Sequence, residues 1–319
     1  MKSISQLTNF YYNDLYPTLQ ELEDERKALK KRINTITLIY LLAVGIIFWF
    51  VYQHTELDTF FAFLPLPLII YFKLYRYLTK DYYVDFKNKI IAPLIDAIDS
   101  NLHYSPTSHI SIENFKGSKL FLEYPDRCRG NDYVKGKIDG VNIEFSDIYA
   151  EKKRRSLKGE EIWETIFQGL FIISEFPKEF HAQTLVLPDR AQKLFGNLVG
   201  GWLQKNNVSR NNLVKMDHPE FEKEFVVYST DQIEARYILT PALMQKLLNY
   251  KRKTKHPLYI SFIGGKVYIA IEHNKDMFET SIFHSLLEYK IAKEYIETLH
   301  LAVGIVEELK LNQKLWSKL

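Results

Sequence analysis

The chain has 319 residues, of which 46% are hydrophobic and 25% charged, and its net charge is +3. This length suggests one or two domains of ordinary globular composition, and so small a net charge gives no basis for nucleic-acid binding. The single cysteine, Cys128, excludes a disulfide within the chain.

Residues 1–32 predict a cytoplasmic amphipathic arm, helical from about residue 3 and broken at Pro17. Fewer than three clean heptads favour packing in cis, although a coiled coil between two copies, and so a homo-oligomer, stays open. Glu21, Glu23, Asp24 and Glu25 precede the apolar run, and no small-residue cleavage site follows it. The run is therefore interpreted as a retained anchor and not as a signal peptide.

Residues 33–78 are the most apolar part of the chain. The segment 33–53 contains no charged residue and is about long enough to cross roughly 30 Å of hydrocarbon as a helix. The segment 57–78 is a weaker candidate, because Pro65 and Pro67 would kink it and Lys73 and Arg76 must reach the headgroups. We predict a transmembrane hairpin, with a re-entrant second segment as the alternative.

Flanking charge predicts the orientation. The link 54–58 contains Glu56 and Asp58 but no Lys or Arg, whereas cations flank both outer ends. The flanking cations are Arg26, Lys27, Lys30, Lys31, Arg32, Lys73, Arg76 and Lys80. By the positive-inside rule, both termini are cytoplasmic, the protein is multi-pass, and the lipid bilayer is its first partner.

Residues 79–106 predict a connector helix, which Pro93 interrupts. From residue 107 the period changes to the alternation of strands. Predicted strands are 119–124, 132–138, 141–153, 165–176, 183–188 and 223–230. Asp139-Gly140 and Gly264-Gly265 predict hairpin turns, the second within 258–273. On 141–153 we expect Ile143, Phe145 and either Ile148 or Tyr149 to point inward.

Four helices are predicted among and after these strands: 188–204, 232–238, 242–251 and, closing the chain, 280–310. Residues 107–319 therefore predict a cytoplasmic α+β domain of antiparallel strands, inserted helices and a long C-terminal helix. The order of elements is that of a pleckstrin-homology-like barrel, which is an analogy from order alone.

Four stretches, 138–153, 165–176, 218–244 and 261–271, resemble a bacterial family catalogued as domain of unknown function 3137. The resemblance covers most of the chain from about residue 80. The resemblance implies a membrane-anchored protein of the bacterial inner (cytoplasmic) membrane with an N-terminal membrane hairpin. The family offers no catalytic residues to carry over.

Metal, cofactor and catalytic motifs are missing from the sequence. The nine histidines are scattered, with no HExxH and no pair four residues apart. There is no GxSxG, no Cys–His signature, no Walker A and no GxGxxG. We therefore predict no catalytic residues, no metal and no cofactor.

A ligand-binding junction is the first candidate site. The residues Ser229, Thr230, Asp231, Glu234 and Arg236 lie where a strand meets a helix, and free N–H groups there can hold an anion. Capping by Thr230 or Asp231 explains the same residues without a ligand.

A carboxylate cluster precedes this junction. It comprises Asp217, Glu220, Glu222 and Glu224, and we expect the three glutamates on one face of an extended segment. Paired carboxylates can perform acid–base or metal chemistry, and a solvated strand face is the alternative.

Two basic loops are the candidate membrane-surface residues. They comprise Lys152, Lys153, Arg154 and Arg155, and Lys251, Arg252 and Lys253. Beside an inner leaflet they could contact anionic headgroups, although solvated loops have the same composition.

The functional prediction is a membrane-anchored cytoplasmic interaction module that binds a protein partner or the inner membrane surface. The alternative is an enzyme of unrecognised type with a carboxylate site near residues 217–236. A channel subunit would require oligomers, because two spans without ionisable midplane residues cannot line a polar pore.

Overall fold

The computed structural model describes residues 3–54, 65–121, 123–138, 140–156, 159–175, 181–189, 213–254, 256–273, 276, 278–288, 293, 295–297, 300 and 304. The chain forms two compact units. The helical unit comprises residues 2–97 and 278–296, and the sheet unit comprises residues 98–277 with 297–319 and Met1.

The helical unit begins with a short helix and a π-helical segment before one long helix. Its elements are α1 (Ile4–Asn9), a π-helix (Phe10–Asp14), α2 (Tyr16–His54), α4 (Pro65–Phe86), a second π-helix (Lys87–Ile91) and α5 (Ala92–Ile98). Pro17 occupies the first turn of α2, where a missing N–H is tolerated, so the predicted break is confirmed. From Tyr16 onward, the predicted arm and the apolar segment after it form one continuous helix.

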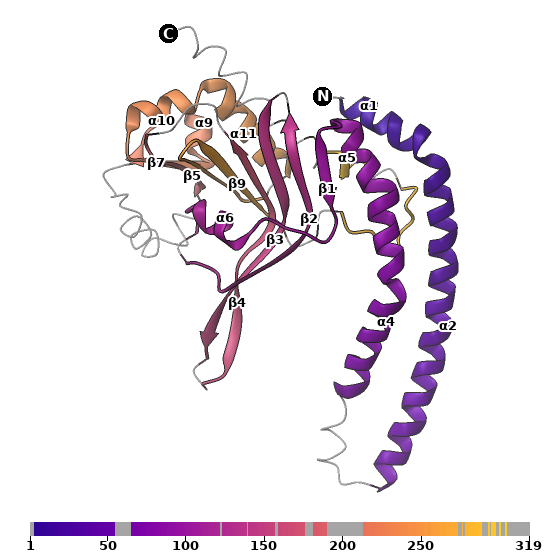
Figure 1. The fold of residues 1–319 in the computed structure, drawn as a ribbon. Coiled ribbons are helices and arrows are strands. Elements are labelled where there is room, and N and C mark those ends of the chain that lie inside the picture. The colour runs from indigo at the N-terminus through magenta and orange to yellow at the C-terminus, as the bar shows by residue number, and fades with distance from the viewer. Residues whose placement is uncertain are drawn as a thin grey trace. The chain divides into compact units, whose positions relative to one another are not determined.

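Helix α4 packs against α2 with the opposite chain direction (Figure 1). The hydroxyls of Thr37 and Tyr71 lie 2.8 Å apart, and Tyr40 donates a hydrogen bond of 2.7 Å to the carbonyl of Pro67. Within the described part of the chain, α2 alone is long and apolar enough to cross a membrane by length and composition. Of the predicted link 54–58, His54 ends α2, and residues 55–58 lie outside the described residues.

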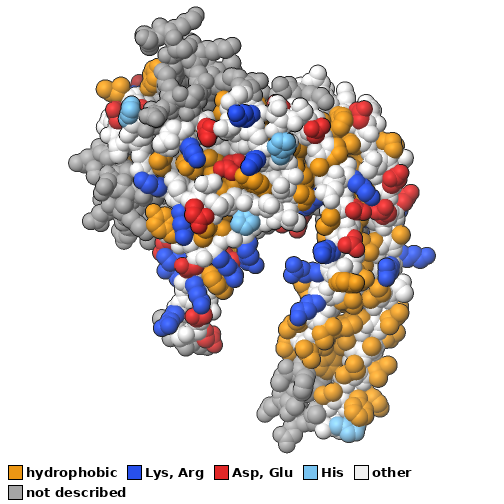
Figure 2. Space-filling view, in the orientation of Figure 1, with side chains coloured by type: hydrophobic (Ala, Val, Ile, Leu, Met, Phe, Trp, Pro, Cys, Tyr) orange, Lys and Arg blue, Asp and Glu red, His pale blue; other side chains and the backbone are white. Residues whose placement is uncertain are grey.

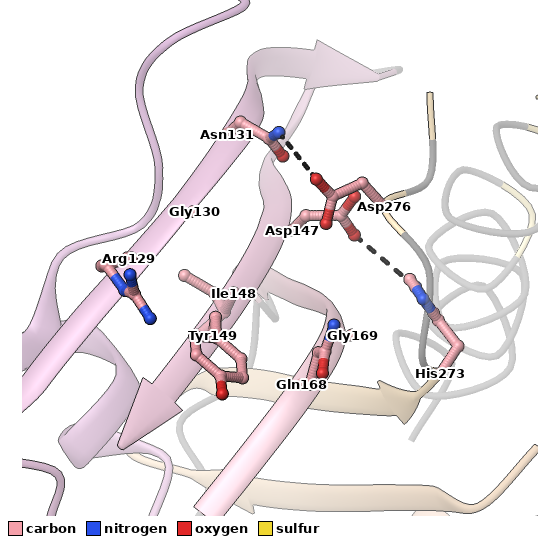
Figure 3. Close-up of a pocket in the computed structure, with 10 residues that line it drawn as sticks. All are labelled: Arg129, Gly130, Asn131, Asp147, Ile148, Tyr149, Gln168, Gly169, His273 and Asp276. Carbon is pink, nitrogen blue, oxygen red and sulfur yellow. Dashed lines mark hydrogen bonds and ion pairs between the residues drawn. The ribbon is translucent and has the colours of Figure 1, made fainter. Parts of the chain in front are cut away.

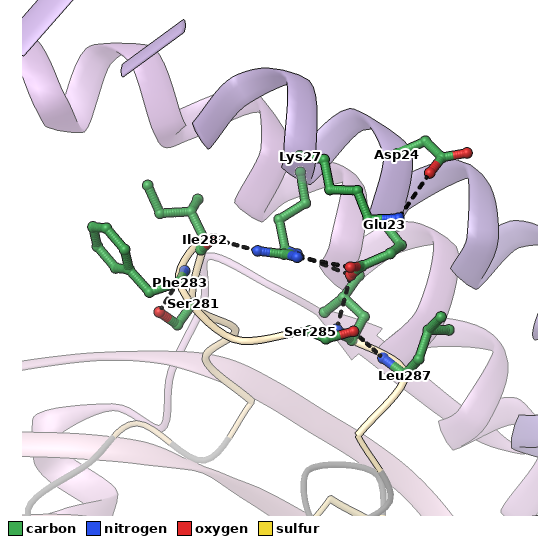
Figure 4. A network of polar contacts seen from close by, with 10 residues as sticks. Glu23, Asp24, Lys27, Ser281, Ile282, Phe283, Ser285 and Leu287 are labelled. Atoms are coloured by element: carbon green, nitrogen blue, oxygen red, sulfur yellow. Dashed lines mark hydrogen bonds and ion pairs between the residues drawn. The ribbon is translucent and has the colours of Figure 1, made fainter. Parts of the chain in front are cut away.

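A buried ion pair holds the returning segment of the chain on α2 (Figure 4). Arg26 donates to Glu23 at 2.7 Å and to the carbonyl of Ile282 at 2.6 Å. Glu23 in turn accepts the N–H of Leu286 at 3.1 Å. Burial opposes ionisation of Glu23, but the hydrogen bonds from Arg26 and Leu286 outweigh it, so its pKa is lowered.

The predicted C-terminal helix is wrong over its first residues. Residues 281–288 form turns, and two of their backbone groups bond to Glu23 and Arg26 instead of to a helical ladder. Residues 293, 295–297, 300 and 304 are helical, and the rest of the predicted range to residue 310 lies outside the described residues.

The sheet unit carries a nine-stranded sheet in the order β1-β2-β3-β4-β9-β8-β5-β7-β6. Its strands are β1 (Leu102–Ser105), β2 (Arg127–Ile138), β3 (Val141–Arg155), β4 (Glu161–Glu175), β5 (Thr184–Pro188), β6 (Leu213–Val214), β7 (Phe225–Ser229), β8 (Leu258–Ile263) and β9 (Lys266–Glu272). All the pairings are antiparallel, which confirms the α+β class. With β1 and β6 at its two edges, the strand order does not follow the expected barrel.

Both predicted hairpin turns are confirmed. Ile138 pairs with Val141, and Ile263 pairs with Lys266. Gly264 and Gly265 have φ of +56° and +73°, the left-handed pair that a tight hairpin turn requires. Ile143, Phe145 and Ile148 are buried; by the alternation of the strand, Ile148 faces the side opposite to the other two.

The core on one sheet face is aromatic. Phe115, from helix α6 (Ile112–Gly117), packs against Phe121, Phe167 and Phe171, with ring centroids 5.0 to 5.9 Å apart. Residues 119–124, expected as a strand, contain no strand among the described positions. Phe121 instead joins this cluster from a loop.

Three further helices belong to the sheet unit: α9 (Pro219–Glu222), α10 (Gln232–Ile238) and α11 (Pro241–Thr254). The last two match the predicted helices. Pro188 is the last residue of β5, and Asp189 directly after it is helical. Residues 190–204 of that predicted helix lie outside the described residues.

Candidate functional site

A polar pocket of about 420 Å³ lies on the sheet face formed by β2, β3 and β4 (Figure 3). Strand register brings its residues together: Asn131 pairs with Asp147, and Arg129 pairs with Tyr149, which pairs with Gln168. A β-bulge in β2 shifts the register between Asn131 and Val134. Because side chains alternate along a strand, this shift puts Asn131 on the same face as Asp147.

Asp147 and His273 form the inner wall of the pocket. Asp147 lies in the middle of β3, and it is only 4% exposed although it carries a carboxylate. His273 follows the last residue of β9, and its Nε2 lies 3.5 Å from Oδ1 of Asp147. The backbone N–H of His273 donates to the carbonyl of Gln168 at 3.0 Å, and this bond fixes the backbone position from which the imidazole side chain extends.

Asn131 and Asp276 close the wall next to this pair. Nδ2 of Asn131 donates a hydrogen bond of 3.3 Å to Oδ2 of Asp276. Oδ1 of Asn131 is buried and accepts no hydrogen bond from the described residues. Two carboxylates and one amide oxygen therefore meet on one side of the pocket (Figure 3).

The opposite rim carries Arg129 and Tyr149. The guanidinium of Arg129 lies 5.0 Å from the centroid of the Tyr149 ring and donates to Glu151 at 2.9 Å. Glu151 also accepts two hydrogen bonds from Arg127, of 2.7 and 3.0 Å. The bonds from Arg127, followed by the charge of Arg129, hold the pKa of Glu151 below its usual value despite its burial.

Two glycines keep the backbone around the pocket close-packed. A Cβ on Gly130 would lie 2.0 Å from the carbonyl oxygen of Asp147, and one on Gly169 would lie 2.1 Å from that of Ile271. Gly169 also has φ of +148°, which disfavours any side chain. These strands therefore approach one another only because glycine stands at both positions.

A second buried acid lies beside the pocket, one residue further along β2. Asp132 is 0% exposed, has φ of +57°, and accepts a hydrogen bond from the hydroxyl of Tyr104. Burial, followed by the charges of Asp132 and Asp147, raises the pKa of Tyr104. The phenol therefore stays neutral, and this region of the sheet unit has a negative potential.

The pocket presents acceptors and an imidazole, and no Ser, Thr or Cys lines it among the described residues. Within the same part of the chain, no three His, Cys, Asp or Glu side chains are grouped to hold a metal ion. Cys128 lies elsewhere, and burial raises the pKa of its thiol to about 11. The arrangement is thus suited to binding a ligand that donates hydrogen bonds.

The predicted junction at residues 229–236 is engaged in bonds within the chain. Asp231 is the N-cap of α10 and accepts from Ile233 and Glu234 at 2.8 and 3.1 Å. The other four residues also have partners. Ser229 bonds to Thr184, Thr230 accepts from Gln183, Glu234 accepts from Ala182, and Arg236 donates to the carbonyl of Lys215. Ligand binding there stays a prediction.

The predicted carboxylate row does not form. Glu220 and Glu222 lie on the short helix α9 and not on an extended segment, because Pro219 starts a helical turn that His218 caps. Glu222 accepts the N–H of Met216 at 2.7 Å, and Glu220 pairs with Arg252 at 2.8 Å. Asp217 is exposed, and Glu224 closes the turn before β7.

The residues predicted to form basic loops lie in regular secondary structure, one set in β3 and the other in α11. Residues 152–155 belong to β3, where Lys152 and Arg154 pair with Glu123 at 3.1 and 2.7 Å. Lys153 pairs with Glu161 at 2.6 Å, and Arg154 also bonds to Glu164. Arg155 stands opposite Glu161 in the register.

The second basic set lies on α11. Lys251 donates to the carbonyl of His256 at 3.0 Å, and Arg252 pairs with Glu220. The side chain of Lys253 lies outside the described residues. Headgroup contact by either basic set stays a prediction.

None of the pocket residues was selected from the sequence as a site. A usable signal was present: Asp147 interrupts the apolar alternation of a long strand, and a buried carboxylate requires partners. Its neighbours Asn131, His273 and Asp276 are far away in the sequence, and only the sheet register brings them together.

Comparisons with known proteins add a family and one distant structure. The model of the family described as "Protein of unknown function (DUF3137)" matches residues 165–311, which confirms the family inferred from the sequence over that range. The match does not extend to the stretch 138–153 or to residue 80. No curated protein matches the chain. The crystal structure of the mycobacterial trehalose monomycolate transport factor A, TtfA, is similar with 10% identity and a TM-score of 0.32, covering 66% of this chain and 90% of that one. A likeness at that TM-score supports no conclusion about this protein.

Proposed function

We propose that this chain, whose residues 165–311 match the model of the DUF3137 family, is a membrane-anchored interaction module that binds a protein partner. In this proposal α2 and α4 form a two-span hairpin in a bacterial inner membrane, and both termini and the sheet unit are cytoplasmic. The observation that carries the anchor is the outward apolar surface of α2.

That surface is extensive. The most apolar part of α2 is 0% buried, and Ile46 and Trp49 are 68% and 67% exposed. The apolar side chains of α4, such as Leu68 at 71%, are exposed as well. Figure 2 shows these side chains gathered along the helices, with Lys and Arg at one end of the apolar zone. Hydrocarbon is the environment that stabilises such a surface.

The support for a protein partner comes from the extended hairpin of β3 and β4 (Figure 1). Residues 152–155 and 161–164, here called the ribbon, pair only with each other in the described sheet. Ile162 and Trp163 are 47% and 41% exposed on it. Arg127 lies 3.7 Å from the centroid of the Trp163 ring. Exposed Trp and Arg are the residues that most often dominate protein interfaces.

Pairing within the ribbon weakens the case for the membrane surface as its partner. The charges of Lys152, Lys153 and Arg154 are offset by Glu123, Glu161 and Glu164, so little net positive charge is left for anionic lipid. The alternative enzyme near residues 217–236 gains no support either, because Glu222, Asp231 and Glu234 each accept backbone N–H groups.

Cysteine labelling tests the anchor and its topology. With Cys128→Ser as background, Glu56→Cys places a thiol in the link and Asp217→Cys places one on the sheet unit. In spheroplasts, a membrane-impermeant maleimide should label the first variant, and the second only after permeabilisation. Labelling of Asp217→Cys in intact spheroplasts, or extraction of the protein by alkaline carbonate, would refute this topology.

Crosslinking in membranes, followed by affinity purification in detergent, tests the interaction. The same partner should be recovered with wild type and with Ile233→Ala, which removes an exposed apolar side chain from α10. Trp163→Ala should lose it. Recovery of the chain by itself, or equal recovery with both variants, would contradict binding through the ribbon.

A further inference from the structure

We propose that the pocket between Asp147, Asp276 and Tyr149 binds a small organic molecule through a protonated primary amine. This site is in the sheet unit, is separate from the ribbon, and does not depend on the membrane anchor. A volume of about 420 Å³ suits a small molecule.

Charge on the inner wall selects a cation. Asp147 is buried and Asp276 is partly buried, and both line the same pocket. A carboxylate has about four acceptor positions, so Asp147 can bind an ammonium group while His273 stays 3.5 Å away. An ammonium group has three N–H donors and no acceptor, which matches a wall of acceptor oxygens.

The amide of Asn131 supplies a third acceptor. Its Nδ2 is committed to Asp276, which orients Oδ1 as the remaining polar atom. That oxygen is buried and has no hydrogen-bond donor among the described residues. A ligand N–H would satisfy it, and a buried acceptor without a donor costs free energy.

The cations that line the pocket leave this wall open to a ligand. Arg129 is on the rim, where Glu151 binds its guanidinium at 2.9 Å. His273 carries charge only when it is protonated. The ring of Tyr149 and the backbone at Gly130 and Gly169 form the remaining surface, which can contact the carbon skeleton of the ligand.

Saturation-transfer difference NMR on the full-length protein in nanodiscs tests the proposal. The probes are butylamine and 1,4-diaminobutane, with 1-butanol as the neutral analogue of the same shape. Both amines should receive saturation and compete with one another, and butanol should receive none. Equal transfer to butanol and butylamine, or no transfer to either amine at millimolar concentration, would overturn it.

Variants locate the site. Asp147→Asn and Asp276→Asn should each weaken amine binding about tenfold or more, as expected for the loss of a charge-assisted hydrogen bond. Asp217→Asn removes the same charge from an exposed position outside the pocket and should bind like wild type. If circular dichroism shows that Asp147→Asn does not fold, the amine affinity of Asp276→Asn tests the site instead. Wild-type affinity in that variant would refute the site.

Discussion

At the residue scale, the pocket depends on glycines that allow close backbone approach and on acids that are buried with partners. Gly130 and Gly169 permit contacts that no Cβ could make. Asp147 and Asp132 are 4% and 0% exposed and lie beside His273 and Tyr104. A buried carboxylate persists only with such partners, so these side chains constrain one another's positions.

Gly169→Ala should destabilise the sheet unit by about 1–3 kcal/mol or more. The added Cβ would lie 2.1 Å from the carbonyl oxygen of Ile271, at a φ of +148°. Urea unfolding followed by circular dichroism measures the change. Gly117→Ala is the control, because its Cβ would only reach ordinary contact with Tyr268 at 3.6 Å. Equal midpoints for the two variants would show that β4 and β9 can separate without cost.

At the element scale, the long helix α2 is buried along its first part and exposed along its second part. Its first part buries Leu19, Leu22 and Ile33 together with the Glu23–Arg26 pair, whereas its apolar second part is exposed. The ion pair binds the carbonyl of Ile282 and the N–H of Leu286, two groups that a helix would pair with each other, and so it opposes a helix in that segment. Amphipathic spacing alone indicates a buried stripe, and the backbone conformation depends on which donors and acceptors face it.

Glu23→Gln should destabilise the helical unit by about 3 kcal/mol at neutral pH, because it leaves the buried Arg26 without its counter-charge. The lowered pKa of Glu23 sets the pH dependence. The ionised carboxylate of Glu23 makes its full contribution to the free energy of unfolding above the ordinary pKa of 4.5. This contribution is lost as pH falls through the lower pKa that Glu23 has in the folded state.

The free energies of unfolding of wild type and variant, measured in urea, should therefore converge as pH falls below 4.5 and through the folded-state pKa of Glu23. The exposed neighbour Glu25 supplies the control, and Glu25→Gln should match wild type throughout. A constant difference between wild type and Glu23→Gln across this pH range would contradict the role assigned to the ion pair.

At the scale of the whole molecule, the chain leaves the helical unit at residue 97 and returns to it at residue 278. The returning segment supplies core residues: Phe278, Ile282 and Leu286 are each 0% exposed. A discontinuous unit of this kind requires both ends of the chain to be in place, and the sheet unit is the insertion between them.

Leu286→Ala should destabilise the helical unit by about 2–5 kcal/mol through the cavity that it leaves. Hydrogen exchange should then show faster exchange in α2 around Leu19 and Leu22, while β4 and β9 keep their protection. Phe283→Ala, at a position 56% exposed, is the control and should leave both units unchanged. Equal loss of protection in the two units would show that they unfold together.

The sequence by itself determined the features that depend on neighbours along the chain. The apolar run, the break at Pro17, the alternating strands and the two glycine hairpins follow from propensity and periodicity, which act over a few residues. The family resemblance, which the family model matches over residues 165–311, is likewise carried by local stretches.

Only the tertiary structure decided which distant residues meet. The bulge in β2 and the antiparallel register bring Asn131 and Asp147 together, and the end of β9 adds His273 and Asp276. The register also pairs the cations of the ribbon with glutamates, so a basic segment becomes nearly neutral. Such contacts depend on strand order and burial, which act across the whole unit, and no local pattern encodes them.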